Sequence, residues 1–155
     1  MASSLAIMSL QPLVVKAGTA RPFSPIGHDA SYCIADGAAT AGNYAFVEQT
    51  VPPGEGPPLH LHTREEEGFY IIAGEITFVV ADKTIVAGPG DFVLGPRNIP
   101  HRFYNSGNVP AKYVMVISPA GFEHFLTEYG DLIASDPTNK AAIVALGDKY
   151  GLQFL

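Results

Sequence analysis

Short runs of apolar and β-branched residues, separated by turn residues, dominate the chain from residue 13 to about residue 119. The gaps hold strong turn signals such as Pro52-Pro53-Gly54 and Gly88-Pro89-Gly90, and the chain has 13 Pro and 16 Gly in all. Strands this short and this evenly spaced favour a sandwich or barrel over alternating strand and helix units. We therefore predict an all-β domain with strands at residues 43–51, 68–72, 75–80, 84–86, 91–94, 99–104 and 112–118.

The pattern changes to a helical period after residue 119. Phe122, Phe125, Leu126 and Tyr129 fall on one face of a predicted helix over residues 121–129. It can fold over one barrel end as a lid or pack against the outer sheet, and the sequence favours neither arrangement. Asp136 and the proline after it predict the start of a second helix, which runs over residues 138–150 and ends at a glycine. The apolar residues 152–155 should dock on the domain.

The composition and charge of the chain limit the classes of protein to which it can belong. The chain has 155 residues, 47% of them apolar, which suits one domain with a real core. Its net charge is −6 and no basic cluster occurs, so we expect no nucleic-acid partner. No apolar stretch approaches the length of a membrane span, so we expect no membrane partner. The single cysteine, Cys33, rules out an internal disulfide, and we predict a buried thiol and a cytoplasmic location.

Three of the five histidines mark a candidate metal site. His60 and His62 are two residues apart, which on a strand places both imidazoles on one face. Glu67 directly precedes the predicted strand over residues 68–72 and would add an anionic ligand. His101 would supply a third imidazole from across the barrel. Mixed nitrogen and oxygen ligands suit Fe, Mn, Ni, Co, Cu or Zn, and the sequence does not choose among them.

These residues stand in two segments that resemble the motifs of the cupin family, G-x5-H-x-H-x3/4-E-x6-G and G-x5-P-x-G-x2-H-x3-N. The chain reads GEGPPLHLHTREEEGFYIIAG and GDFVLGPRNIPHRFYN, and it matches nine of the ten fixed positions. The departure is Asn98 in place of glycine, and Asn also tolerates a left-handed turn. The resemblance implies a single cupin (jelly-roll) β-barrel over about residues 13–119. A C-terminal helical segment over about 120–155 completes one domain spanning residues 1–155.

The carboxylate ligand lies within a run of three glutamates. Glu66 and Glu67 both satisfy the motif by count, but only Glu67 has six residues before Gly74. We therefore predict Glu67 as the ligand and keep Glu66 as the alternative. We expect the side chains of Glu65 and Glu66 to be solvated. For His28 and His124 we expect ordinary surface positions.

The resemblance to small quercetin 2,3-dioxygenase-like cupins implies a function. One divalent metal ion on His60, His62, Glu67 and His101 would bind a phenolic or enolic substrate, dioxygen would add to it, and Glu67 would accept a proton. The alternatives are a metal-dependent isomerase, cyclase or lyase, and a cupin that only binds a small ligand. The resemblance also suggests a homodimer in which residues 10–16 exchange between subunits. Tyr44, Phe46, Phe69, Phe78 and Phe103 are candidates for an apolar pocket wall, although each of them by itself is more typical of ordinary core.

Overall fold

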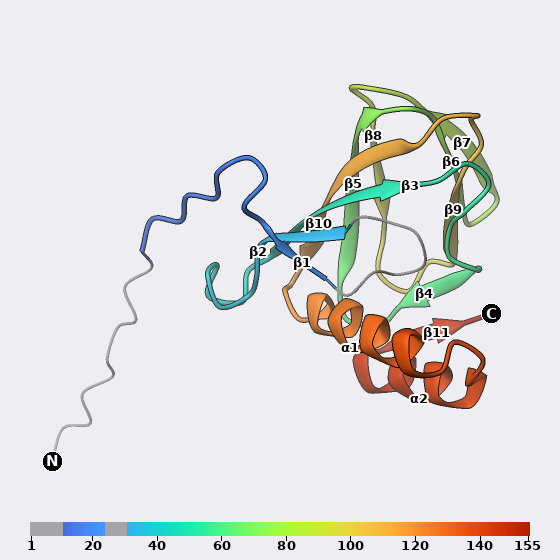
Figure 1. Ribbon diagram of the computed structural model, residues 1–155. Coiled ribbons are helices and arrows are strands. Elements are labelled where there is room, and N and C mark those ends of the chain that lie inside the picture. Colours follow the sequence, from blue (N-terminus) through green and yellow to red (C-terminus); the bar gives the residue numbers. More distant parts are fainter. Residues whose placement is uncertain (1–10, 24–30) are drawn as a thin grey trace, which may run out of the picture.

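The computed structural model describes residues 11–23 and 31–155, and it consists mainly of short antiparallel strands with two helices near the C-terminus (Figure 1). The strands are β1 (Arg21–Pro22), β2 (Ser31–Ala35), β3 (Ala45–Val51), β4 (His60–His62), β5 (Glu66–Ala73), β6 (Ile76–Val80), β7 (Lys83–Ala87), β8 (Phe92–Gly95), β9 (His101–Asn105), β10 (Ala111–Ser118) and β11 (Leu152–Phe154). The helices are α1 (Phe122–Ser135) and α2 (Lys140–Tyr150).

Two antiparallel sheets carry the fold. One sheet has the strand order β1-β2-β3-β10-β5-β8, and the other has the order β11-β4-β9-β6-β7. All seven strands predicted from the sequence are present, with ends shifted by no more than two residues. The prediction of a mostly-β fold is confirmed.

The core lies between the two sheets and is rich in aromatic rings. The Phe69 ring lies 5.1 Å from that of Phe78, 5.3 Å from that of Phe103 and 5.4 Å from that of Tyr113, between ring centres. Each such pair adds about 0.5–1.5 kcal/mol beyond the burial of its surface. The core is therefore held by apolar packing. Cys33, on β2, is buried, as predicted.

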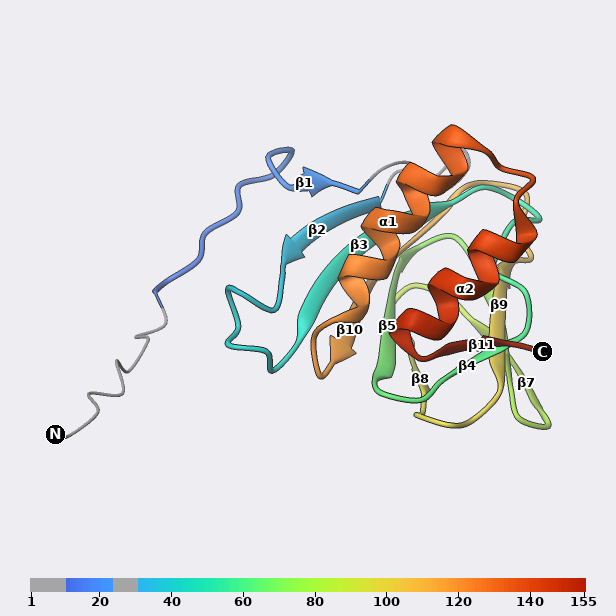
Figure 2. The same ribbon diagram turned by 90° about the horizontal axis from the view of Figure 1, so that it is seen from below.

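The C-terminal segment covers one end of the two sheets. In Figure 1 both helices lie beneath the strands, and Figure 2, seen from below, shows them in front of the sheets. α1 extends to Ser135, six residues beyond the predicted end. The apolar C-terminus does dock, because Leu152, Gln153 and Phe154 pair with β4 as an added strand.

The predicted start of α2 is wrong by two residues. Asp136 ends α1, and its carboxylate accepts hydrogen bonds from the backbone and hydroxyl of Thr138. The N-cap of α2 is Asn139, whose side chain accepts from the amide of Ala142. Asp136 has an extended backbone, the conformation favoured before proline. Its carboxylate is bonded within this turn and does not cap α2. The end at Gly151 is confirmed, with a left-handed backbone there.

Among the described residues, none of the helices combines the length and the apolar character that crossing a membrane requires.

Candidate metal centre

Four side chains from three strands converge between the two sheets. His60 and His62 come from β4, Glu67 from β5 and His101 from β9. All four are buried, and their potential ligand atoms lie within 4.8 Å of one another. Spacing of two residues on β4 does place both imidazoles inward, and Leu61 between them faces the other way. The structure thus brings together the four residues that the sequence singled out.

Strand pairing fixes how these residues meet. His60 pairs directly with His101 across β4 and β9, and Glu67 pairs with Gly95 across β5 and β8. The His101 ring lies against Gly95, where an added Cβ would come within 3.2 Å of its atoms. Asn98, in the turn before His101, has φ 62°, so the left-handed conformation expected for it is present. The loop and the glycine together position the third imidazole.

Each of the three histidines is anchored through its Nδ1 atom. The Nδ1–H of His60 donates to the Pro58 carbonyl at 2.7 Å, and that of His101 donates to the Ile99 carbonyl at 2.9 Å. His62 donates in the same way to the Glu65 carboxylate at 2.6 Å. A carbonyl oxygen can only accept, so in His60 and His101 the Nδ1 atom carries the proton. The Nε2 atoms are thereby left to face inward, as they do in metal-ligating histidines.

One nitrogen at the centre of this cluster has unmet bonding capacity. His62 Nε2 is buried and makes no hydrogen bond within the described part of the chain, although it lies 3.3 Å from Glu67 Oε2. The same carboxylate oxygen lies 3.3 Å from His101 Nε2. A buried polar atom without a partner is costly, and a cation among these nitrogen and oxygen atoms would satisfy it. The donor set therefore fits one divalent transition metal ion.

Burial and neighbouring charges shift the pKa values of the residues in the cluster in different directions. Burial lowers the pKa of His60 to about 4, so this imidazole is neutral at pH 7. Burial would also lower the pKa of His62, but the carboxylates of Glu67 and Glu65 outweigh it and raise that pKa to about 10. Burial opposes ionisation of Glu67, yet the neighbouring imidazoles of His62 and His101 hold its pKa well below the usual range. Glu67 is thus an anion that faces three imidazoles.

Glu65 was expected to be solvated, and this expectation is wrong. Its side chain is 3% exposed, because its carboxylate accepts the hydrogen bond from His62 Nδ1–H that offsets the loss of solvent. Glu66 is exposed, as expected, and its carboxylate lies 3.8 Å from the guanidinium of Arg97. His124 is also exposed, as expected, whereas His28 lies outside the described residues.

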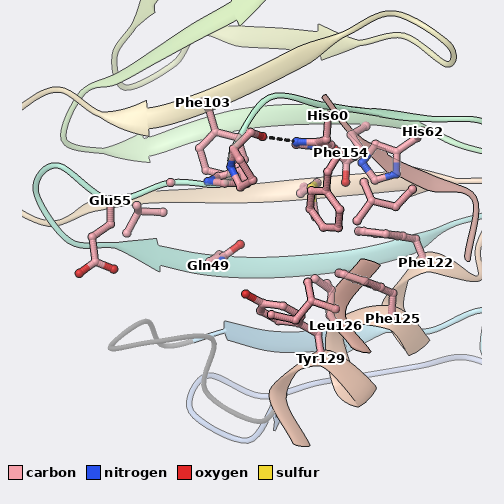
Figure 3. A pocket seen from close by; sticks show the side chains of 18 of the residues that line it. Gln49, Glu55, His60, His62, Phe103, Phe122, Phe125, Leu126, Tyr129 and Phe154 are labelled. Carbon is pink, nitrogen blue, oxygen red and sulfur yellow. Dashed lines mark hydrogen bonds and ion pairs between the residues drawn. The ribbon is translucent and has the colours of Figure 1, made fainter. Parts of the chain in front are cut away.

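A cavity of about 700 Å³ opens onto the cluster, and its walls are mostly apolar. Phe122 of α1 stands edge-on over the His62 ring with 4.4 Å between ring centres (Figure 3). Phe125, Leu126 and Tyr129 continue the same wall along α1, and β11 contributes Leu152 and Phe154. Of the two arrangements left open for this helix, the structure therefore shows the lid-like one.

Of the five side chains predicted as pocket wall, only Phe103 lines this cavity. Phe69 and Phe78 are 1% exposed and belong to the core behind Phe103. Tyr44 is 44% exposed and Phe46 points to the outer face of β3, since the alternate residues beginning with Ala45 face inward. Tyr44 and Phe46 were thus assigned to the wrong face of β3, because this strand carries apolar residues on both faces.

The sequence also matches known proteins. The family profile described as a cupin domain matches residues 47–117. The chain is 33% identical over 92 residues to quercetin 2,3-dioxygenase of Bacillus subtilis, covering 59% of this chain and 27% of that protein. It is 32% identical over 81 residues to the tetracenomycin polyketide synthase protein TcmJ of Streptomyces glaucescens, covering 52% of this chain and 53% of that protein.

Solved structures agree at the level of the fold. The crystal structure of a predicted oxalate decarboxylase from Thermotoga maritima superimposes with a TM-score of 0.61 at 24% identity, covering 69% of this chain and 99% of that one. The domain match spans β3 to β10 and includes all four residues of the cluster. Together with the two histidine motifs, these matches show that residues 47–117 carry a cupin domain.

Proposed function

We propose that the chain is a mononuclear metal-dependent oxidoreductase, a dioxygenase that acts on a phenolic or enolic small molecule. The observation that carries the proposal is the set of three Nδ1-anchored imidazoles and Glu67, which face one another at the wall of an apolar cavity. His60, His62, Glu67 and His101 would hold one divalent ion. The 33% identity over 92 residues to a quercetin 2,3-dioxygenase supports this choice.

The chain's own residues suit this chemistry. Four protein ligands leave one or two positions on an ion that prefers five or six ligands, so a substrate oxygen can reach it. The bound ion would supply Lewis acidity towards that oxygen and redox chemistry towards dioxygen. Glu67 lies at the cavity wall and would accept the proton of a substrate hydroxyl. Phe122 and Phe125 give the cavity an apolar wall on the α1 side.

Oxygen uptake tests the proposal. We expect protein reconstituted separately with Fe, Mn, Ni, Co or Cu to consume dioxygen in the presence of a flavonol with at least one of these ions. The Zn form should consume none, because Zn²⁺ has no redox chemistry. Protein stripped of metal is the background control. Absence of oxygen uptake with every ion, across flavonols and other enols, would contradict a dioxygenase.

A second candidate is a metal-dependent isomerase, cyclase or lyase, which the resemblance to a polyketide synthase protein supports. Its product would form without dioxygen, so an anaerobic incubation followed by mass spectrometry separates it from the first. A cupin that only binds a small ligand would give neither oxygen uptake nor product.

We also propose that the protein is a homodimer. Residue 10 lies outside the described residues, and residues 11–16 belong to no strand or helix there. Their side chains Leu13 and Val14 are 53% and 73% exposed. On the outer sheet face, Tyr70 pairs with Phe92 across β5 and β8, and both rings are exposed. Such apolar surface favours association. We expect light scattering to give twice the mass of one chain, and a monomer would contradict the proposal.

A further inference from the structure

Polar side chains lie at the end of the cavity that is remote from the histidines. Gln49 of β3 and Tyr113 of β10 pair directly across the two strands, and the Tyr113 hydroxyl donates to Gln49 Oε1. Tyr129 of α1 lines the same cavity. Figure 3 shows Gln49 and Tyr129 on one side of the cavity, and His60 and His62 on the other. The cavity therefore has polar groups at both ends and apolar walls between them.

Strand register gives the separation of the two ends. Glu67 pairs with Ile117 of β10, and Tyr113 lies four residues before Ile117 on the same inward face. At about 3.3 Å per residue, four residues correspond to roughly 13 Å along the strand. Met115, which lies between them on that face, lines the cavity as an apolar residue. A molecule that reaches both ends must be about that long.

The remote end has hydrogen-bonding capacity that residues 11–23 and 31–155 leave unused. The Gln49 side chain accepts from Tyr113 through Oε1, and within the described part of the chain its Nε2 donates to no protein acceptor. The Tyr129 hydroxyl likewise makes no hydrogen bond to a described residue. Burial raises the pKa of Tyr129, so the hydroxyl is neutral and can both donate and accept. Unpaired polar groups facing an apolar cavity favour ligands that carry a matching polar atom.

We propose that Gln49 and Tyr129, with Gln49 held by Tyr113, form a second polar anchor that binds a hydroxyl or carbonyl oxygen at the far end of the substrate. This inference rests on the proposed function and narrows its substrate class. The substrate is a rigid, mostly apolar molecule of two or three rings, with one oxygenated end at the metal centre and another at the anchor. A compact substrate such as a small dicarboxylate would leave the anchor and the aromatic walls uncovered.

Two probe molecules that differ only at the far end test the anchor. They are 3-hydroxyflavone, which carries chelating oxygens at one end only, and its 4′-hydroxylated derivative. Binding is measured by calorimetry to the Zn-reconstituted full chain, so that affinity is obtained without turnover. We expect the hydroxylated probe to bind about tenfold more tightly, the effect of one good hydrogen bond in a desolvated site.

Three variants test which side chains cause the tighter binding of the hydroxylated probe. Gln49→Leu and Tyr129→Phe should each bring the ratio of the two probe affinities, which measures the preference for the hydroxylated probe, close to one. Met115→Leu, an apolar change of similar volume in the same wall, should keep the preference. Tyr129→Phe provides the test if Gln49→Leu does not fold, because it leaves the Gln49–Tyr113 pair intact.

The outcomes separate this inference from the proposed function. Equal binding of the two probes by the natural chain, or a preference that survives both variants, overturns the anchor and leaves the dioxygenase untouched. Failure of both probes to bind overturns the anchor and the flavonol-like substrate class together. Oxygen uptake by the redox-metal form is measured on its own, so its absence counts against the proposed function alone.

Discussion

Replacing His62 with alanine is expected to weaken metal binding strongly, so that most of any metal that copurifies with the natural chain is lost, while the two sheets stay folded. His62 Nε2 is the buried nitrogen that has no hydrogen bond in the described structure, and His62 is held in place by Glu65 at 2.6 Å. Losing a partner that only orients a ligand costs about 10–100-fold in metal affinity, and losing the ligand itself should cost at least as much. Phe122 of the core contacts this imidazole, but Phe69, Phe78 and Phe103 pack against one another, so the packing between the two sheets is retained.

Elemental mass spectrometry of protein purified without added metal gives the measurement, and circular dichroism reports the fold. His124→Ala is the matched control, because its side chain is 65% exposed and lies on α1 outside the cluster. That variant should keep its metal. Unchanged metal content in the His62→Ala protein would show that His62 is not a ligand, and loss of metal in both variants would point to adventitious binding.

The parts of the site that follow strand geometry could be predicted from the sequence. His60 and His62 share a face because alternate residues of a strand do, and the spacing to Gly74 selected Glu67, which lies on the buried side of β5. These features depend on local spacing, which can be read from the sequence. The approach of these residues to His101 depends instead on the pairing of β4 with β9, and it was expected only from the position of His101 in the second motif.

The parts that depend on tertiary packing could not be predicted. Glu65 lies in the turn before β5, where strand alternation gives no orientation, so its burial against His62 has no signal in the pattern. The cavity wall is supplied by α1 and β11, whose docking is decided by contacts far apart in sequence. Tyr44 and Phe46 were misassigned because β3 carries apolar residues on both faces, and a shift of one residue exchanges the faces.

The last prediction concerns which glutamate of the run binds the metal. Glu67→Gln should weaken metal binding by about 10–100-fold, whereas Glu66→Gln should change it by less than about twofold. Glu67 is buried among the three imidazoles and supplies the anionic oxygen of the cluster. A glutamine keeps the shape of the side chain and removes the charge, so the loss measures the ligand role of the carboxylate. Glu66 points to solvent, where its ion pair with Arg97 contributes little.

Competition with a chelator gives the affinity of each variant for a single added metal, and thermal unfolding monitored by circular dichroism excludes a general loss of fold. The two substitutions are chemically identical and one residue apart, so each controls for the other. The reverse order of affinities would move the carboxylate ligand by one position and turn the inward face of β5 over. That result would also contradict the register that pairs Glu67 with Gly95 and Ile117, on which the 13 Å estimate for the cavity depends.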